Sequence, residues 1–194
     1  MKPSLNIGKF LGVEIGVHYT WLFIAVPICV TLAGRFSTMH PDWSGTVVWA
    51  TAVGTALLFF VTLIMHELSH AIVARAYNLP VHSITLFALG GVANIEKEPE
   101  TPKAEFWVGI VGPIVSAIIG VICFIAASGL GWSPPDSTTS PIASSLAWLG
   151  YINLTLALFN MIPAFPLDGG RVLKAVIWWI TKNAEKSSRI AGRS

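Results

Sequence analysis

The stretch Met65-His66-Glu67-Leu68-Ser69-His70 follows directly on the apolar run Ala56-Leu57-Leu58-Phe59-Phe60-Val61-Thr62-Leu63-Ile64. Such a run predicts part of a helix that crosses a lipid bilayer. Ionisable side chains are costly in hydrocarbon, so two histidines and a glutamate at the end of this run indicate a functional site. We therefore interpret the rest of the chain as the protein that surrounds these three side chains.

Composition places the whole chain among integral membrane proteins. Of its 194 residues, 54% are hydrophobic and only 11% are charged, whereas a soluble domain has about 25% charged residues. So few charges cannot cover the surface of a water-soluble globule of this size. The net charge is +2, and no basic run with interleaved aromatic residues occurs, so nothing indicates a nucleic-acid partner.

Four apolar segments predict four transmembrane helices. We interpret the first as a retained helix, because a mixed segment precedes it and it is long for a signal peptide. A fifth helix, Arg171–Thr181, is too short to cross a bilayer alone. The four segments are residues 19–33, 47–77, 106–127 and 142–161.

Residues 79–95 have a different pattern, in which β-branched and aromatic residues alternate with others before Gly90-Gly91. The two glycines predict a turn, and the whole segment predicts a β-hairpin or re-entrant strand pair between spans two and three. The predicted fold class is thus an all-α polytopic membrane protein with one small strand pair. Residues 1–17 predict either a short strand or an irregular arm.

Several polar and small residues allow further predictions about the segments between and within the spans. We expect residues 96–105, which are charged and contain prolines, to form a loop in water, and we expect His40 to be solvated in the 34–44 turn. Small residues follow three- and four-residue steps in the third span, a pattern typical of close helix packing in membranes. They are Gly109, Gly112, Ser116 and Gly120.

The distribution of Lys and Arg predicts the orientation in the membrane. The loops 34–44 and 129–141 contain only Arg35, whereas the other lysines and arginines lie in or next to residues 1–17, 78–105 and the C-terminal segment. Cytoplasmic segments carry the excess of Lys and Arg. We therefore expect a multi-pass protein of the cell membrane with its N-terminus, C-terminus and His66–His70 site toward the cytoplasm.

The spacing of His66 and His70 predicts a metal site. Residues four apart on an α-helix lie within about 40° of one another, so both imidazoles can reach one ion. Glu67 is offset by about 100° and can flank that ion without binding it. A catalytic zinc usually has three protein ligands and a water. Asp168 is the candidate third ligand, because it lies in an apolar stretch at a similar predicted depth.

Other interpretations remain open for some of these residues. His66, Glu67 and His70 could form a solvated polar helix face, although their position in an apolar run disfavours this. His82 is interpreted as a strand residue, and Asn160 either caps the fourth helix or hydrogen-bonds a substrate or its oxyanion. The alternative functions are a divalent-metal transporter or metal-binding membrane protein, a catalytically silent scaffold, and a metallohydrolase for soluble substrates.

The motifs together resemble the site-2 protease family of intramembrane zinc metalloproteases. The resemblance rests on His66-Glu67-Leu68-Ser69-His70, Asn160-x-x-Pro163 and Leu167-Asp168-Gly169, with support from Gly90-Gly91 and Gly109-x-x-Gly112-Pro113. It is nearest to the bacterial and archaeal branch, whose members often carry C-terminal cystathionine-β-synthase-type domains.

The extent of the resemblance leads to expectations about domain organisation. Residues 1–194 should form a single intramembrane metalloprotease domain, and no PDZ or soluble regulatory domain is visible. Family members typically have more helix after the Asp-Gly segment, so we expect the chain to be a fragment or to lack that part.

The resemblance implies zinc-dependent hydrolysis of peptide bonds in transmembrane protein substrates within the lipid bilayer. Such a helical substrate must unwind first, and an exposed strand edge within residues 81–95 could hold it extended. The implied ligands of one zinc ion per chain are His66, His70 and Asp168, the implied acid/base is Glu67, and the candidate substrate or oxyanion contacts are Asn160, Gly90 and Gly91.

Overall fold

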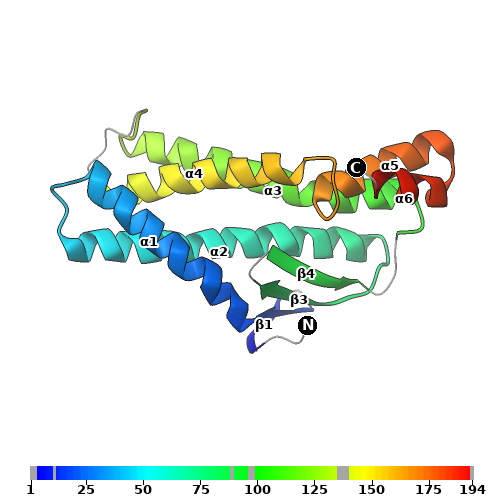
Figure 1. The fold of residues 1–194 in the computed structure, drawn as a ribbon, viewed down its shortest axis with the longest axis horizontal. Coiled ribbons are helices and arrows are strands. Elements are labelled where there is room, and N and C mark those ends of the chain that lie inside the picture. Colours follow the sequence, from blue (N-terminus) through cyan, green and yellow to red (C-terminus); the bar gives the residue numbers. More distant parts are fainter. Residues whose placement is uncertain (1–3, 11, 88–89, 96–98, 135–139, 193–194) are drawn as a thin grey trace.

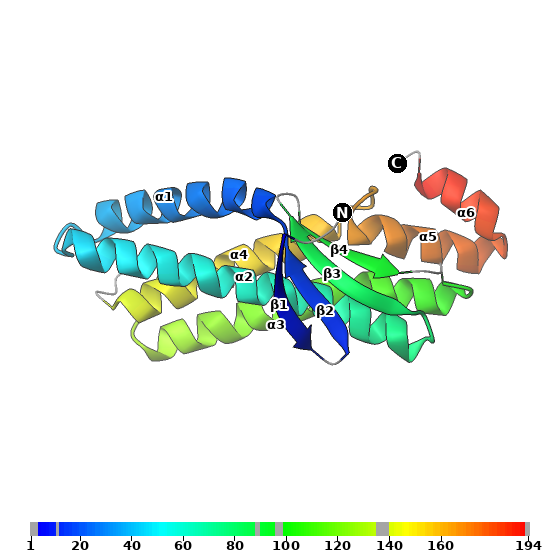
Figure 2. The ribbon, with the colours of Figure 1, turned by 90° about the horizontal axis from the view of Figure 1, so that it is seen from below.

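A computed structural model describes residues 4–10, 12–87, 90–95, 99–134 and 140–192. They form an elongated helical bundle with a small sheet at one side (Figures 1 and 2). The strands are β1 (Leu5–Phe10), β2 (Val13–Val17), β3 (Val81–Phe87) and β4 (Gly90–Ile95). After a short 3-10 turn, η1 (Tyr19–Trp21), the helices are α1 (Leu22–Met39), α2 (Gly45–Ala76), α3 (Pro102–Gly129), α4 (Pro141–Asn160), α5 (Asp168–Thr181) and α6 (Ala184–Ala191).

Within the described part of the chain, four helices are long and apolar enough to cross a membrane. They are η1 with α1, then α2, α3 and α4, which confirms the prediction of a multi-pass membrane protein. Hydroxyl side chains at Ser44, Thr101 and Ser140 cap three of these helices, each accepting a hydrogen bond from the backbone N–H three residues later. Such caps satisfy one of the four backbone N–H groups left unpaired at a helix start.

The longest helix, α2, lies between the other spans. Its N-terminal half packs against α1 through the buried side chains of Leu32, Phe36 and Ala52. α3 and α4 run alongside each other (Figure 1), and glycines at their contact allow the close approach that the sequence predicts. A Cβ added at Gly120 would lie 3.0 Å from the Gly150 carbonyl oxygen.

The predicted strand pair is present, but it belongs to a larger sheet. β3 and β4 pair antiparallel, and the N-terminal arm supplies the antiparallel hairpin β1–β2. β2 runs parallel to β3, with Glu14 opposite Ser83, which gives the order β1-β2-β3-β4. β3 is therefore an inner strand, and the free edge on this side of the sheet belongs to β4.

The turn between β3 and β4 is not where the two glycines predict it. Gly90 and Gly91 are the first residues of β4 and are paired with Phe87 and Leu86. The connecting positions 88–89 lie outside the described residues. A pair of glycines can continue a strand as well as form a turn, and pairing with β3 decides between them here.

The sheet packs on the C-terminal half of α2 (Figure 2). A buried apolar cluster joins the two, and Val108 of α3 belongs to it as well. This cluster fixes the part of α2 that carries the second histidine of the motif. Its members are Val13, Leu68, Ala71, Ala74, Leu79, Val81, Ile84 and Val108.

Two polar residues that the sequence places in water are buried. Glu105 lies in the first turn of α3, is only 2% exposed and accepts a hydrogen bond from Arg171. His40 is 4% exposed, and its Nε2 lies 3.0 Å from the Ser144 hydroxyl while its ring stacks on Trp43. Each buried side chain has a hydrogen-bond partner far away in the sequence, Arg171 for Glu105 and Ser144 for His40, which makes its burial less costly.

Candidate metal centre

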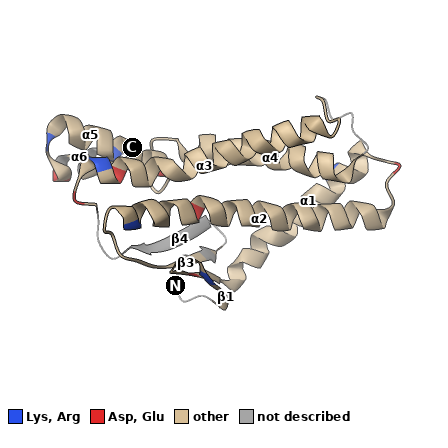
Figure 3. Ribbon diagram, turned by 180° about the vertical axis from the view of Figure 1, so that it is seen from behind, with Lys and Arg blue, Asp and Glu red and all other residues tan. Residues whose placement is uncertain are grey.

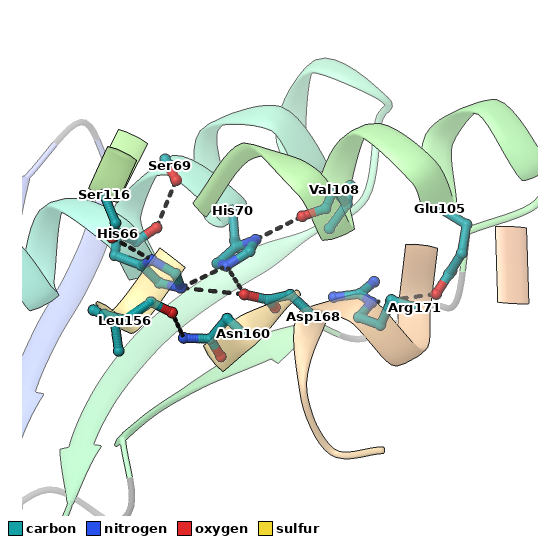
Figure 4. A network of polar contacts seen from close by, with 10 residues as sticks. All are labelled: His66, Ser69, His70, Glu105, Val108, Ser116, Leu156, Asn160, Asp168 and Arg171. Carbon is teal, nitrogen blue, oxygen red and sulfur yellow. Dashed lines mark hydrogen bonds and ion pairs between the residues drawn. The ribbon is translucent and has the colours of Figure 1, made fainter. Parts of the chain in front are cut away.

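The candidate site lies where α2 meets the first turn of α5 (Figure 4). His66 and His70 occupy successive turns of α2, and Asp168 is the first residue of α5. The segment 161–167 is a turn that connects α4 to α5. Gly169 and Gly170 allow α5 to start tightly against this turn, because a Cβ at Gly170 would lie 2.9 Å from the Ala164 carbonyl carbon.

Three donor atoms from these residues form a nearly equilateral triangle. His66 Nε2 lies 3.2 Å and His70 Nε2 lies 3.3 Å from Asp168 Oδ2, and the two nitrogens are 3.3 Å apart. A tetrahedral zinc site with bonds of about 2.0–2.1 Å has ligand atoms about 3.3–3.4 Å apart. The triangle therefore fits one face of that tetrahedron, and the fourth corner is left for a water or substrate atom.

The second nitrogen of each histidine ring, Nδ1, contacts α3, and these contacts suit metal binding through Nε2. His70 Nδ1 donates to the Val108 carbonyl oxygen at 2.6 Å, and His66 Nδ1 lies 2.9 Å from the Ser116 hydroxyl. Because a carbonyl can only accept, the Nδ1 of His70 carries the proton and its Nε2 can offer a lone pair to a metal. Partners of this kind orient metal-binding histidines in known sites.

α3 comes unusually close to the donor atoms through Gly112. A Cβ at this position would overlap His70 Nε2 and would lie 2.7 Å from His66 Nε2. Both histidines are buried, and the Asp168 side chain is 15% exposed. The absence of a side chain at Gly112 therefore provides the space in which an ion could sit between the ligands.

The other predicted site residues are not members of this triangle of donor atoms. Glu67 lies between the two histidines in sequence and is half-buried on α2. Asn160 is the last residue of α4, and its Nδ2 donates to the Leu156 carbonyl oxygen at 3.0 Å. Gly90 and Gly91 belong to β4 and are not members of the donor group.

Sequence reasoning missed the contribution of α3. Val108, Gly112 and Ser116 contact the histidines although α3 supplies no ligand. The pattern of small residues in this span contained a signal, but it predicted only helix packing. The carbonyl of Val108 could not be found from sequence, because every residue has one.

Comparisons with known proteins agree with the motifs. The sequence model of peptidase family M50 matches residues 54–138 and 132–192. A protein of Synechocystis sp., described as a candidate zinc metalloprotease, is 39% identical over the whole chain, which covers 49% of that relative. A zinc metalloprotease of Methanocaldococcus jannaschii is 34% identical over 91% of the chain and 46% of the relative.

A solved structure extends the agreement to the fold. The site-2 protease from Methanocaldococcus jannaschii matches with a TM-score of 0.61 and 32% identity, over 96% of this chain and 77% of that one. The chain spans about half the length of the curated relatives named above, 49% and 46%.

Proposed function

This chain belongs to peptidase family M50, and from that premise we propose that it hydrolyses peptide bonds of transmembrane proteins inside the membrane. The observation that carries the proposal is the triangle of His66, His70 and Asp168 donor atoms, within a protein whose helices can cross a bilayer. We assign these three residues as ligands of one zinc ion and Glu67 as the acid/base.

The proposed reaction uses the residues around the metal in distinct ways. A zinc ion held there supplies Lewis-acid chemistry, because it polarises the oxygen atoms that it binds. Glu67 accepts a proton from the attacking water as the new C–O bond forms. It then gives this proton to the leaving amine as the C–N bond breaks.

Asn160 is proposed to contact the substrate carbonyl. Its Nδ2 already donates to Leu156, but an amide nitrogen has two hydrogens and so has a second to donate. A hydrogen bond to the carbonyl oxygen becomes stronger as negative charge develops there, which lowers the barrier to attack.

The test of the proposed function is Glu67→Gln. We expect this variant to keep zinc and to lose at least 99% of cleavage, because general acid–base groups contribute about 10²–10⁴-fold. The assay uses protein in liposomes and a single-span transmembrane polypeptide with a helix-destabilising segment. Zinc is measured by metal analysis.

Glu14→Gln is the matched control, because Glu14 is an exposed residue of β2. It should leave cleavage unchanged. The opposite result is a wild type that transports zinc without cleaving the polypeptide, and a Glu67→Gln variant that transports it equally well. That result would contradict the proposal and favour a transporter.

The free edge of β4 is proposed to hold the substrate extended. Peptide bonds in a helix are hidden, and pairing with a strand exposes them while it satisfies the backbone. β4 fits this role because it is the last strand of the sheet, next to β3. Gly90 and Gly91 would then contact substrate through their backbone.

The active site is proposed to face the cytoplasm. Charged residues gather at the end of the molecule that holds the sheet, α5 and α6 (Figure 3). At the other end, residues 34–44 and 129–141 contain a single Lys or Arg, Arg35, which lies near the end of α1. The excess of Lys and Arg on cytoplasmic segments supports this orientation.

A further inference from the structure

An ion pair between the buried Glu105 and the partly exposed Arg171 joins α3 to α5 beside the candidate metal centre. Arg171 Nε donates to Glu105 Oε1 at 3.2 Å, and the Glu105 side chain is only 3% exposed (Figure 4). The second carboxylate oxygen of Glu105 has no hydrogen-bond partner among the described residues. A buried carboxylate without a partner is strongly unfavourable, so the negative charge of Glu105 favours keeping Arg171 where it is.

The pair lies one helical turn from the site on both helices. Arg171 follows Asp168 by three residues on α5, and Glu105 precedes Val108 by three residues on α3. Residues three apart lie on the same face of a helix. Arg171 therefore lies on the same face of α5 as Asp168, and Glu105 lies on the same face of α3 as Val108.

Gly109 allows the two helices to meet closely at this point. A Cβ there would lie 3.1 Å from Arg171 Cβ and 3.3 Å from the Asp168 carbonyl oxygen. α3 thus touches the backbone of the residue that supplies the carboxylate. The same helix contacts both histidines, through Val108 and Ser116, so it fixes the relative positions of all three donor groups.

We propose that the Glu105–Arg171 ion pair is a positioning pair that holds the first turn of α5 against α3 and so keeps Asp168 within reach of the metal. The inference rests on the proposed function, because it treats Asp168 as a zinc ligand. α5 has 14 residues and follows the 161–167 turn, so its place depends on such contacts. Without the pair, the carboxylate moves relative to the two histidines on α2.

The test measures zinc affinity and unfolding temperature separately, and it does not require cleavage. Glu105→Gln and Arg171→Met should each weaken zinc binding about 10–100-fold, as loss of orienting partners does in other metal sites. Affinity is measured in detergent by competition with a chelator. The visible spectrum of bound Co²⁺ gives an independent measure of ligand number.

The double variant Glu105→Gln/Arg171→Met separates positioning from general stability. Its unfolding temperature without metal should recover toward that of the wild type, because no buried charge is left alone. Its zinc affinity should stay weak, because the ion pair that holds the first turn of α5 against α3 is still missing. If the pair served stability alone, the unfolding temperature and the zinc affinity of the double variant would recover together. That result would overturn the proposal.

Controls separate this proposal from the proposed function. Glu100→Gln changes an exposed glutamate just before α3 and should bind zinc within twofold of the wild type. If the wild type binds zinc and both single variants bind it equally well, the positioning role alone is wrong. If the wild type binds no zinc, the proposed function is wrong as well.

Discussion

At the scale of single residues, the candidate centre depends on what surrounds the ligands as much as on the ligands. His66 and His70 each use one ring nitrogen for a partner on α3 and present the other to Asp168. A metal-binding histidine needs one ring nitrogen for the metal and the other for a hydrogen-bond partner, because that partner fixes the ring orientation and the tautomer. Gly112 adds the space that an ion between these donor atoms would require.

Gly112→Ala tests this space. We expect zinc affinity to fall about tenfold or more, because the added methyl group would occupy the volume at the two Nε2 atoms. Gly54→Ala is the control, since nothing lies within 4 Å of a Cβ at that position of α2. Chelator competition measures both variants, and equal zinc affinity for the two would show that Gly112 is not needed.

At the scale of elements, the sheet gives α2 a fixed support and offers a strand edge. Within the part of the chain that the structure describes, β4 is paired on one side only, with β3. Adjacent residues of an edge strand alternate between an N–H toward the neighbouring strand and an N–H toward the outside. Val92 and Ala93 are adjacent in β4, so one of them offers its N–H to an incoming chain.

Single proline substitutions at Val92 and Ala93 test the substrate role of this edge. One variant should lose a hydrogen bond to β3 and lower the unfolding temperature. The other should keep the unfolding temperature and the zinc content but lower cleavage of the transmembrane polypeptide by about tenfold, because a proline has no N–H to donate. Wild-type cleavage by the stable variant would contradict strand addition.

At the scale of the whole molecule, the polar centre lies between α2, α3 and the start of α5, and large apolar side chains remain on the outside of the bundle. Phe23, Ile125 and Leu158 are each more than 60% exposed, as expected for side chains that face lipid. α5 and α6 lie at one end of the bundle, and the sheet lies beside the C-terminal half of α2 (Figures 1 and 2). The centre therefore lies toward the C-terminal end of α2, on the side of the bundle that carries α5 and α6.

Cysteine labelling tests the proposed orientation. In a variant without Cys29 and Cys123, a membrane-impermeant maleimide applied to intact cells should label Asp42→Cys but not Lys103→Cys. Asp42 is exposed in the turn between α1 and α2, and Lys103 is exposed in the first turn of α3. After cell lysis both should react. Labelling of Lys103→Cys alone in intact cells would mean that the molecule has the opposite orientation.

The sequence predicted those features of the protein that depend only on residues close to one another along the chain. Long apolar runs identify the spans because burial in lipid depends on local composition. The i, i+4 spacing of His66 and His70 brings them to one helix face whatever the rest of the chain does. Asp168 could be proposed as their partner because an acid in an apolar stretch needs a compensating group.

Only the tertiary structure decided the features that join distant segments. The pairing of β2 with β3, the burial of Glu105 by Arg171 and the contact of His40 with Ser144 each depend on two residues far apart in the chain. No local pattern carries such information, because a glutamate in the first turn of a helix looks the same whether water or an arginine contacts it. The geometry around His66, His70 and Asp168 arises in the same way, since α3 approaches them only when the whole bundle is packed.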